Sequence, residues 1–123
     1  MAATILLVED NPITSKLVRF TLEAQQLGVA VAGDGAAAMR AFGEHAVALV
    51  LVDLVLPDMD GFALLEASHD LDPTRPVILM TAFSAIDTAM RAFEVGAYQY
   101  LMKPFRLDAL AKVLEKALQS RPD

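Results

Sequence analysis

The segment ALVLVDLVLPDMDG, residues Ala48–Gly61, contains a continuous apolar run that stops at one carboxylate, Asp53. The run ALVLV (Ala48–Val52) has the length of a β-strand and shows no alternation of apolar and polar residues. A strand of this kind is typical of a parallel sheet that is covered on both faces. Asp53 is therefore expected at the carboxyl end of a buried strand.

Four further apolar runs of strand length occur along the chain, and longer stretches with helical periodicity separate them. These runs are Thr4–Val8, Val29–Ala32, Val77–Met80 and Tyr98–Met102. Five strands that alternate with five helices, strand first, predict an α/β fold with a doubly wound parallel sheet. In this fold class ligands bind in a crevice at the carboxyl ends of the strands.

The helices are predicted from apolar periodicity and from capping signals. Asn11-Pro12 provides an N-cap followed by proline at the first helical position, and Ser84 with Asp87 resembles a capping box. Apolar stripes run through Ile13, Leu17, Phe20, Ala24 and Leu27, through Ile86, Ala89, Met90 and Phe93, and through Leu107, Leu110, Ala111, Leu114 and Leu118. Two shorter helices are expected near Ala36–Phe42 and Gly61–Ser68. Asp58 and Asp60 are expected to serve as turn and cap residues, and Gly61 to permit a tight turn.

Composition narrows the function classes. A chain of 123 residues has the usual size of one domain, and the absence of cysteine excludes disulfides, thiolate zinc sites and cysteine nucleophiles. The formal net charge of −6 argues against direct binding of nucleic acid, which depends on neutralising phosphates. The longest apolar runs are far shorter than a membrane span, and Met1–Val8 lacks the features of a signal peptide. We expect no membrane association and a cytoplasmic location.

Polar residues follow the predicted strands in a pattern that indicates chemistry. Glu9-Asp10 follows the first strand, Asp53 ends the third, Thr81 ends the fourth and Lys103 follows the fifth. The carboxyl ends of parallel strands open on one edge of the sheet, so these groups should converge. Clustered carboxylates either raise a pKa or hold a cation, and hard oxygen ligands without His or Cys favour Mg²⁺. With an ammonium and a hydroxyl beside them, the cluster indicates phosphoryl transfer onto an aspartate.

Four segments resemble the signature segments of response-regulator receiver domains, in the same order and with similar spacing. They are LLVEDN (Leu6–Asn11), LVDLVLPDMDG (Leu51–Gly61), TAF (Thr81–Phe83) and GAYQYLMKPF (Gly96–Phe105). The resemblance covers essentially the whole chain and implies one receiver domain over residues 1–123. The tail from Gln119 to Asp123 is a candidate for the start of a linker. It also implies a flavodoxin-like three-layer α/β/α arrangement with strand order 2-1-3-4-5.

The resemblance assigns roles to residues that match the family pattern. Asp53 would be the phosphoacceptor, and Mg²⁺ would be bound by Glu9, Asp10, Asp53 and the backbone carbonyl of Val55. Lys103 would contact the phosphoryl group, and its bond to the following proline would be cis.

A conformational switch is implied by the same family. Thr81 would bond the phosphoryl group and Tyr100 would turn inward, which would alter the surface of the fourth helix, fifth strand and fifth helix. The expected donor is a sensor histidine kinase or a histidine phosphotransfer protein. The expected target is an output domain or an effector protein, and phosphorylation-dependent homodimerisation is a further expectation. Such a domain is a regulatory phosphoacceptor that catalyses its own Mg²⁺-dependent phosphorylation and slow dephosphorylation.

Three other functions are compatible with parts of the pattern. An FMN carrier of the same fold needs a Ser/Thr/Gly-rich phosphate loop, whereas EDNPITS (Glu9–Ser15) opens with two acids. A phosphatase of the haloacid-dehalogenase type needs a second acid two residues after its nucleophile, and Val55 stands there. A degenerate receiver, kept only as a protein-interaction module, is the remaining alternative, although the set of Glu9, Asp10, Asp53, Thr81 and Lys103 is intact.

Overall fold

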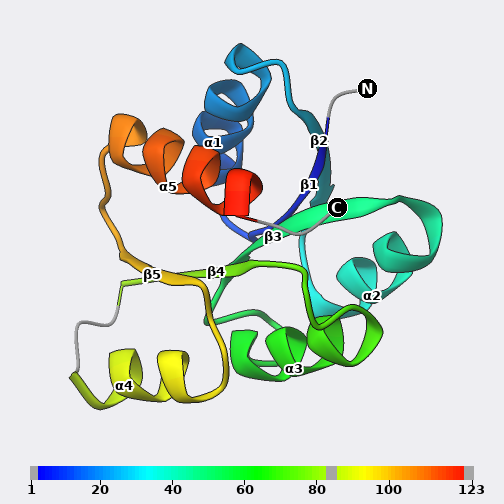
Figure 1. Ribbon diagram of the computed structural model, residues 1–123, viewed down its shortest axis with the longest axis vertical. Coiled ribbons are helices and arrows are strands. Elements are labelled where there is room, and N and C mark those ends of the chain that lie inside the picture. Colours follow the sequence, from blue (N-terminus) through cyan, green and yellow to red (C-terminus); the bar gives the residue numbers. More distant parts are fainter. Residues whose placement is uncertain (1–2, 83–85, 121–123) are drawn as a thin grey trace.

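A computed structural model describes residues 3–82 and 86–120, in which five strands alternate with five helices (Figure 1). The strands are β1 (Thr4–Val8), β2 (Gly28–Ala32), β3 (Val47–Asp53), β4 (Val77–Thr81) and β5 (Gln99–Met102). The helices are α1 (Pro12–Ala24), α2 (Gly35–Glu44), α3 (Gly61–Leu71), α4 (Ile86–Glu94) and α5 (Leu107–Ser120). The predicted alternation is confirmed, with strand ends that differ by one residue at most.

All strand pairs in the sheet are parallel, and the strand order is β2-β1-β3-β4-β5. This confirms the order implied by the family resemblance. The central strand β3 lies between β1 and β4, and it buries every residue from Leu49 to Asp53. Its continuous apolar run follows from that position, because helices cover both faces of the strand.

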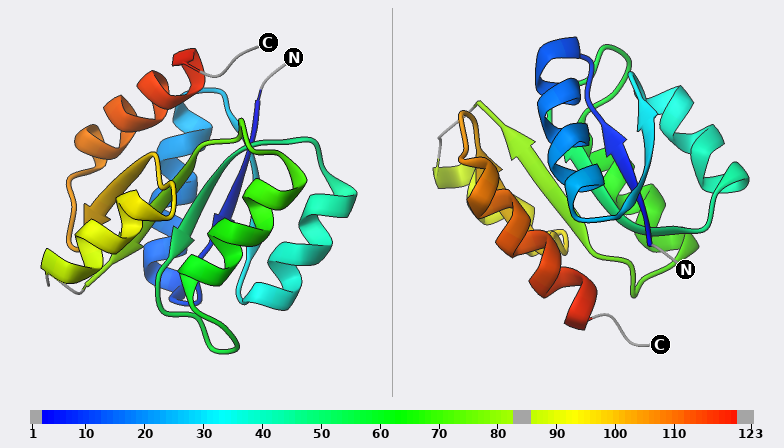
Figure 2. Two further views of the ribbon diagram at one scale, coloured as in Figure 1. Left: turned by 60° about the horizontal axis from the view of Figure 1, so that its bottom comes forward. Right: turned by 90° about the horizontal axis from the view of Figure 1, so that it is seen from above.

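Two layers of helix enclose the sheet. Helices α1 and α5 cover one face, whereas α2, α3 and α4 cover the other (Figures 1 and 2). Alternate residues of the strands supply the two halves of the core: Ile5, Leu49 and Ile78 face α1 and α5 with Leu110 and Leu114. Leu6, Val50 and Leu79 face the other layer with Leu64 and Leu65. The predicted three-layer architecture is confirmed.

Side-chain caps fix where three helices begin. Asn11 caps α1 by accepting hydrogen bonds from the amides of Ile13 (2.9 Å) and Thr14 (3.2 Å), as predicted. Asp34 caps α2, and Asp60 caps α3. The capping box predicted for α4 depends on Ser84, which lies outside the described residues.

The apolar stripe predicted for α1 identifies a helix, but most of its residues do not face the sheet. Val18 and Leu22 are the buried residues of α1, whereas Ile13, Leu17 and Phe20 are 72%, 52% and 72% exposed. The helix carries two apolar stripes, and periodicity alone does not distinguish which one packs on the sheet. The exposed stripe starts next to the carboxyl edge of the sheet.

The ends of the chain bear on two further predictions. Helix α5 continues through Gln119 to Ser120, and residues 121–123 lie outside the described part of the chain, so the start of a linker there stays a prediction. Among the described residues, no helix is both long and apolar enough to cross a membrane.

Candidate phosphorylation and metal site

The predicted site residues meet at the carboxyl edge of the sheet around one hollow of about 320 Å³. Glu9 and Asp10 follow β1, Asp53 ends β3, Thr81 ends β4 and Lys103 follows β5. The hollow is lined by Glu9, Asp10, Asn11, Asp53, Val55, Thr81, Ala82 and Lys103. Tyr100 is the one predicted residue outside this lining.

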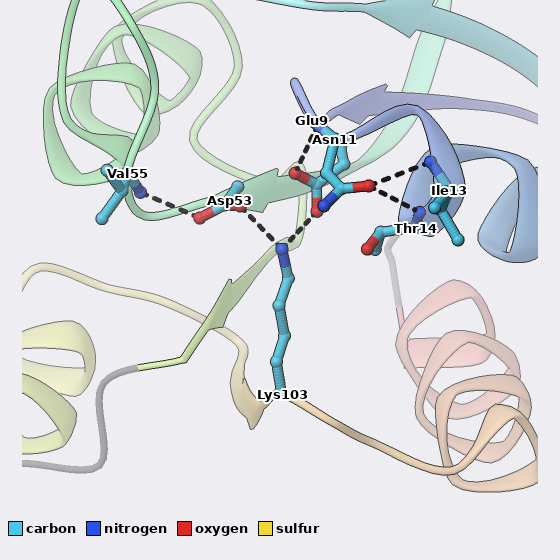
Figure 3. Close-up of polar contacts among 7 residues, drawn as sticks. All are labelled: Glu9, Asn11, Ile13, Thr14, Asp53, Val55 and Lys103. Atoms are coloured by element: carbon cyan, nitrogen blue, oxygen red, sulfur yellow. Dashed lines mark hydrogen bonds and ion pairs between the residues drawn. The ribbon is translucent and has the colours of Figure 1, made fainter.

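Lys103 joins the two buried carboxylates of the site. Its Nζ donates to Asp53 Oδ2 at 2.7 Å and also to Glu9 Oε1 (Figure 3). The side chain of Glu9 is fully buried, that of Asp53 is 11% exposed and that of Lys103 is 20% exposed. The peptide bond between Lys103 and Pro104 is cis, as the resemblance implied.

Burial and charge shift the pKa values of this ion-pair network. Burial raises the pKa of the Glu9 carboxyl, and the neighbouring Asp53 adds to the rise, while the Lys103 ammonium opposes it. Burial acts against the charged form of Lys103, but its bonds to Asp53 and Glu9 outweigh that effect and raise its pKa. The ammonium of Lys103 is therefore held protonated. The raised pKa of Glu9 means that the nearby ammonium only partly offsets the cost of burying the Glu9 carboxylate.

Backbone amides hold the remaining oxygens of both carboxylates. The amide of Asn11 donates to Glu9 Oε2 at 3.2 Å, and the amide of Val55 donates to Asp53 Oδ1 at 2.9 Å (Figure 3). Each carboxylate is thus fixed by the backbone that directly follows its own strand.

The acidic residues have the chemistry of a divalent-cation site. One carboxylate oxygen each from Glu9, Asp10 and Asp53 lies within 4.8 Å of the others, and Asp10 is exposed to solvent. Two carboxylates about 4 Å apart repel by ~4 kcal/mol at an effective dielectric of 20. Lys103 balances one of the three negative charges, which leaves two for a cation. All-oxygen donors with room for water suit Mg²⁺, so the residues present fit the predicted ion.

The loop between β3 and α3 is closed by short backbone contacts. The amide of Gly61 donates to the Leu54 carbonyl at 2.7 Å, and Val55 pairs with Asp60 in an isolated antiparallel bridge. A Cβ at Gly61 would lie 2.8 Å from Leu54 Cα and 2.9 Å from the Asp53 carbonyl oxygen. Glycine is therefore required here by the close approach of two backbones, and this approach keeps Val55 beside the site.

Asp58 of this loop makes a contact that sequence reasoning did not locate. Its two carboxylate oxygens accept hydrogen bonds from the amides of Gly35 (2.7 Å) and Ala36 (3.0 Å), at the start of α2. These bonds hold the pKa of Asp58 below its ordinary value. The sequence predicted a turn or cap residue, but a cap 23 residues away leaves no local signal.

Thr81 and Tyr100 occupy adjacent strands and differ in burial. Thr81 is fully buried, and its carbonyl accepts a 2.7 Å hydrogen bond from the amide of Lys103. Tyr100 is partly buried and packs against the part of the core that faces α2, α3 and α4. Burial raises the pKa of its hydroxyl. The rim of the sheet therefore carries both predicted switch residues, one inside the hollow and one outside it.

A second, largely apolar hollow of about 390 Å³ opens beside the acidic one. It is lined by Thr14, Leu17, Val18, Ala82, Lys103, Pro104, Phe105 and Leu107. Ala82 and Lys103 line both hollows. Sequence reasoning did not find this hollow; the available signal was the exposed apolar stripe on α1, which includes Leu17.

The fold and site define an α/β domain with an acidic, lysine-containing pocket at the carboxyl edge of a parallel sheet. Residues 5–115 match the family described as "Response regulator receiver domain". The chain belongs to this family and is a receiver domain of the kind that functions in two-component phosphorelays.

Relatives and solved structures agree with this assignment. The chain is 39% identical over 114 residues to the transcriptional regulatory protein ZraR of Escherichia coli. The aligned segment makes up 93% of this chain and 26% of ZraR. The crystal structure of NtrX from Brucella abortus in complex with ADP superposes with a TM-score of 0.92 at 35% identity, covering 98% of this chain and 28% of NtrX. A CheY-like receiver domain protein from Methanospirillum hungatei has a TM-score of 0.92 at 26% identity, covering 98% of this chain and 97% of its own. The chain thus spans about a quarter of the length of ZraR.

Proposed function

We propose that Asp53 accepts a phosphoryl group from a phosphohistidine on a sensor kinase or a phosphotransfer protein, in a Mg²⁺-dependent reaction. The observation that carries this proposal is the junction at Lys103, whose ammonium binds both Asp53 and Glu9 in the lining of the acidic hollow. Asp53 sits at the end of the central strand with its side chain reaching that hollow, as an acceptor must.

The transfer is a displacement at phosphorus. A carboxylate oxygen of Asp53 forms the new O–P bond as the P–N bond of the donor breaks, and the imidazole leaves with the electron pair and takes up a proton. Glu9, Asp10, Asp53 and the Val55 carbonyl would hold Mg²⁺, and the ion would supply positive charge that favours the transfer. The ammonium of Lys103, already 2.7 Å from Asp53, stabilises the added negative charge. Hydrolysis of the acyl phosphate then resets the domain, so the domain is a regulatory phosphoacceptor.

The apolar hollow beside the site supports docking of the donor on α1. A donor must bring its phosphohistidine to the mouth of the acidic hollow, and both hollows share Ala82 and Lys103. Ile13 and Leu17 are exposed on the adjoining face of α1. An apolar surface of this kind at the entrance fits an amphipathic helix of the donor.

We further propose that phosphorylation is read out at the surface formed by α4, β5 and α5. Thr81 directly follows Met80, the register partner of Asp53 on β4, and Tyr100 lies on the neighbouring strand β5. Movement of Thr81 toward the phosphoryl group would give Tyr100 space to change position. The affected surface exposes Met90, Phe93 and Met102, which suit contact with an output domain, an effector or a second copy of the chain.

Relatives favour one kind of output. ZraR is a transcriptional regulatory protein, so we propose that this domain controls a transcription-regulating partner or attached domain. The cytoplasmic location of the protein stays a prediction.

Intact mass spectrometry with acetyl phosphate and Mg²⁺ tests the phosphoacceptor. We expect a phosphoryl-sized gain in mass for the wild type and none for Asp53→Asn, which keeps the shape of the side chain. A gain that persists in Asp53→Asn would place the acceptor elsewhere. No gain in the wild type, together with no response to beryllofluoride, would favour a degenerate receiver, and repeated turnover of phosphate esters would favour a phosphatase.

A further inference from the structure

The first turn of α2 is capped by two carboxylates from different parts of the chain. Asp34, the residue before α2, accepts a hydrogen bond from the Ala37 amide at 2.7 Å. Asp58 accepts from Gly35 and Ala36, with one oxygen on each amide. Because the first amides of a helix have no partner inside the helix, each of these bonds satisfies a group that would otherwise need water. Of these capping bonds, those of Asp58 connect the helix to the β3–α3 loop.

Packing reinforces this connection between the β3–α3 loop and α2. Gly35 is buried, and a Cβ there would lie 2.5 Å from the Met59 side chain. The loop therefore packs directly on the first turn of α2, where Asp58 accepts the hydrogen bonds and the Met59 side chain contacts Gly35. A side chain at position 35 would force the Met59 side chain to leave this contact.

The same loop carries the backbone of the proposed metal site. Val55 lies three residues before Asp58, its amide holds Asp53 Oδ1, and its carbonyl is a proposed Mg²⁺ ligand. The amide of Leu56, the residue after Val55, donates to the Met59 carbonyl at 3.3 Å, which closes a tight turn from Leu56 to Met59 that contains Asp58. A loop closed in this way transmits the position of Asp58 to Val55, because few backbone torsions separate them.

We propose that Asp58 is a positioning residue for the metal site, which acts by fastening the β3–α3 loop to the first turn of α2. This inference rests on the proposed binding of Mg²⁺ by Asp53 and the Val55 carbonyl. Without the hydrogen bonds from α2 to Asp58, the Val55 carbonyl would occupy a wider range of positions. Part of the free energy of Mg²⁺ binding would then be spent on ordering that carbonyl. By reciprocity, bound Mg²⁺ tightens the contact between Asp58 and α2.

The test compares Asp58→Ala with Asp34→Ala, its matched control. Each substitution removes one carboxylate from the same helix end, but only the first detaches the loop. The Mg²⁺ dissociation constant is measured by calorimetry and by NMR titration of the isotopically labelled protein. We expect Asp58→Ala to weaken Mg²⁺ binding by about fivefold or more, the lower range of measured couplings between sites. Asp34→Ala should stay within twofold of the wild type, and Asp58→Asn, which keeps one acceptor oxygen, should fall between.

Amide hydrogen exchange supplies a readout that loss of stability alone would not move. In the wild type and in Asp34→Ala, saturating Mg²⁺ should slow exchange at Gly35 and Ala36, whereas in Asp58→Ala it should not. Equal affinities in wild type and Asp58→Ala, or equal losses in both alanine variants, would overturn the inference while leaving the proposed function intact. A wild type that binds no Mg²⁺ would refute the proposed function and this inference with it.

Discussion

Replacing Lys103 with methionine should destabilise the protein strongly in the absence of Mg²⁺. The substitution keeps most of the apolar stem but removes the ammonium that pairs with Glu9 and Asp53. Breaking a buried ion pair by removing one partner costs roughly 3–5 kcal/mol, because an uncompensated charge stays buried. Since the Lys103 side chain is 20% exposed, water screens part of the charge, and we take about 2–3 kcal/mol as the expected loss.

Urea unfolding in EDTA measures this loss directly. Thermal unfolding gives a second measurement. At this chain length a loss of ~1 kcal/mol in unfolding free energy lowers Tm by roughly 4 °C, so the Tm of Lys103→Met should fall by about 8–12 °C. Saturating Mg²⁺ should restore much of the stability of Lys103→Met, because the cation takes over the neutralisation of Glu9 and Asp53. Lys112→Met, on the exposed side of α5, is the control for loss of one positive charge.

A double variant separates the ion pair from other effects of the substitution. Glu9→Gln removes the fully buried carboxylate, whose charge has no ammonium partner in Lys103→Met. The double variant Lys103→Met/Glu9→Gln should therefore recover part of the unfolding free energy that Lys103→Met loses. A Lys103→Met protein within about 0.5 kcal/mol of the wild type in EDTA would match an ordinary surface substitution and would refute the reasoning. No recovery in the double variant would contradict the assignment of the loss to buried carboxylates.

Three further outcomes are expected. Gly61→Ala should lose about 1–3 kcal/mol of unfolding free energy, because its Cβ would press on the Asp53 carbonyl; Gly43→Ala, with no atom within 4 Å of the added Cβ, should not be destabilised. Asn11→Ala should cost ~1 kcal/mol in urea unfolding through loss of the α1 cap, and an unchanged midpoint would contradict that role. The pKa of Asp58 is lowered in the folded state, so its contribution is present above the ordinary value of 3.8 and is lost as the pH falls through the folded value. The difference in unfolding free energy between wild type and Asp58→Asn should therefore shrink as the pH is lowered. A difference that grows instead would contradict the lowered pKa of Asp58.

Local sequence patterns predicted the elements of this fold and the residues at the strand ends, but not contacts between distant segments. Thr4–Val8 and Asn11-Pro12 are read correctly because strand length, apolar continuity and capping are local properties. The edge at which Glu9, Asp53 and Lys103 meet was also predictable, since all parallel strands end on one side.

Other features depend on tertiary structure and were missed or misread. Arg75 is an example: its guanidinium lies over the Phe42 ring at 4.8 Å and lies 3.9 Å from the Asp72 carboxylate, and its side chain is only 11% exposed. Nothing near Arg75 in the sequence signals that a helix from earlier in the chain supplies an aromatic ring. The outward stripe on α1 and the reach of Asp58 to α2 were hidden for the same reason.

The ion-pair junction at Lys103 can form only after the whole sheet has folded. Glu9 and Lys103 are 94 residues apart, and the groups around the hollow come from the ends of four strands. No fragment that lacks β5 can assemble this set, because the ammonium arrives with the last strand. A partly synthesised or misfolded chain therefore lacks the complete set of side chains, and we expect it not to accept a phosphoryl group at the proposed site.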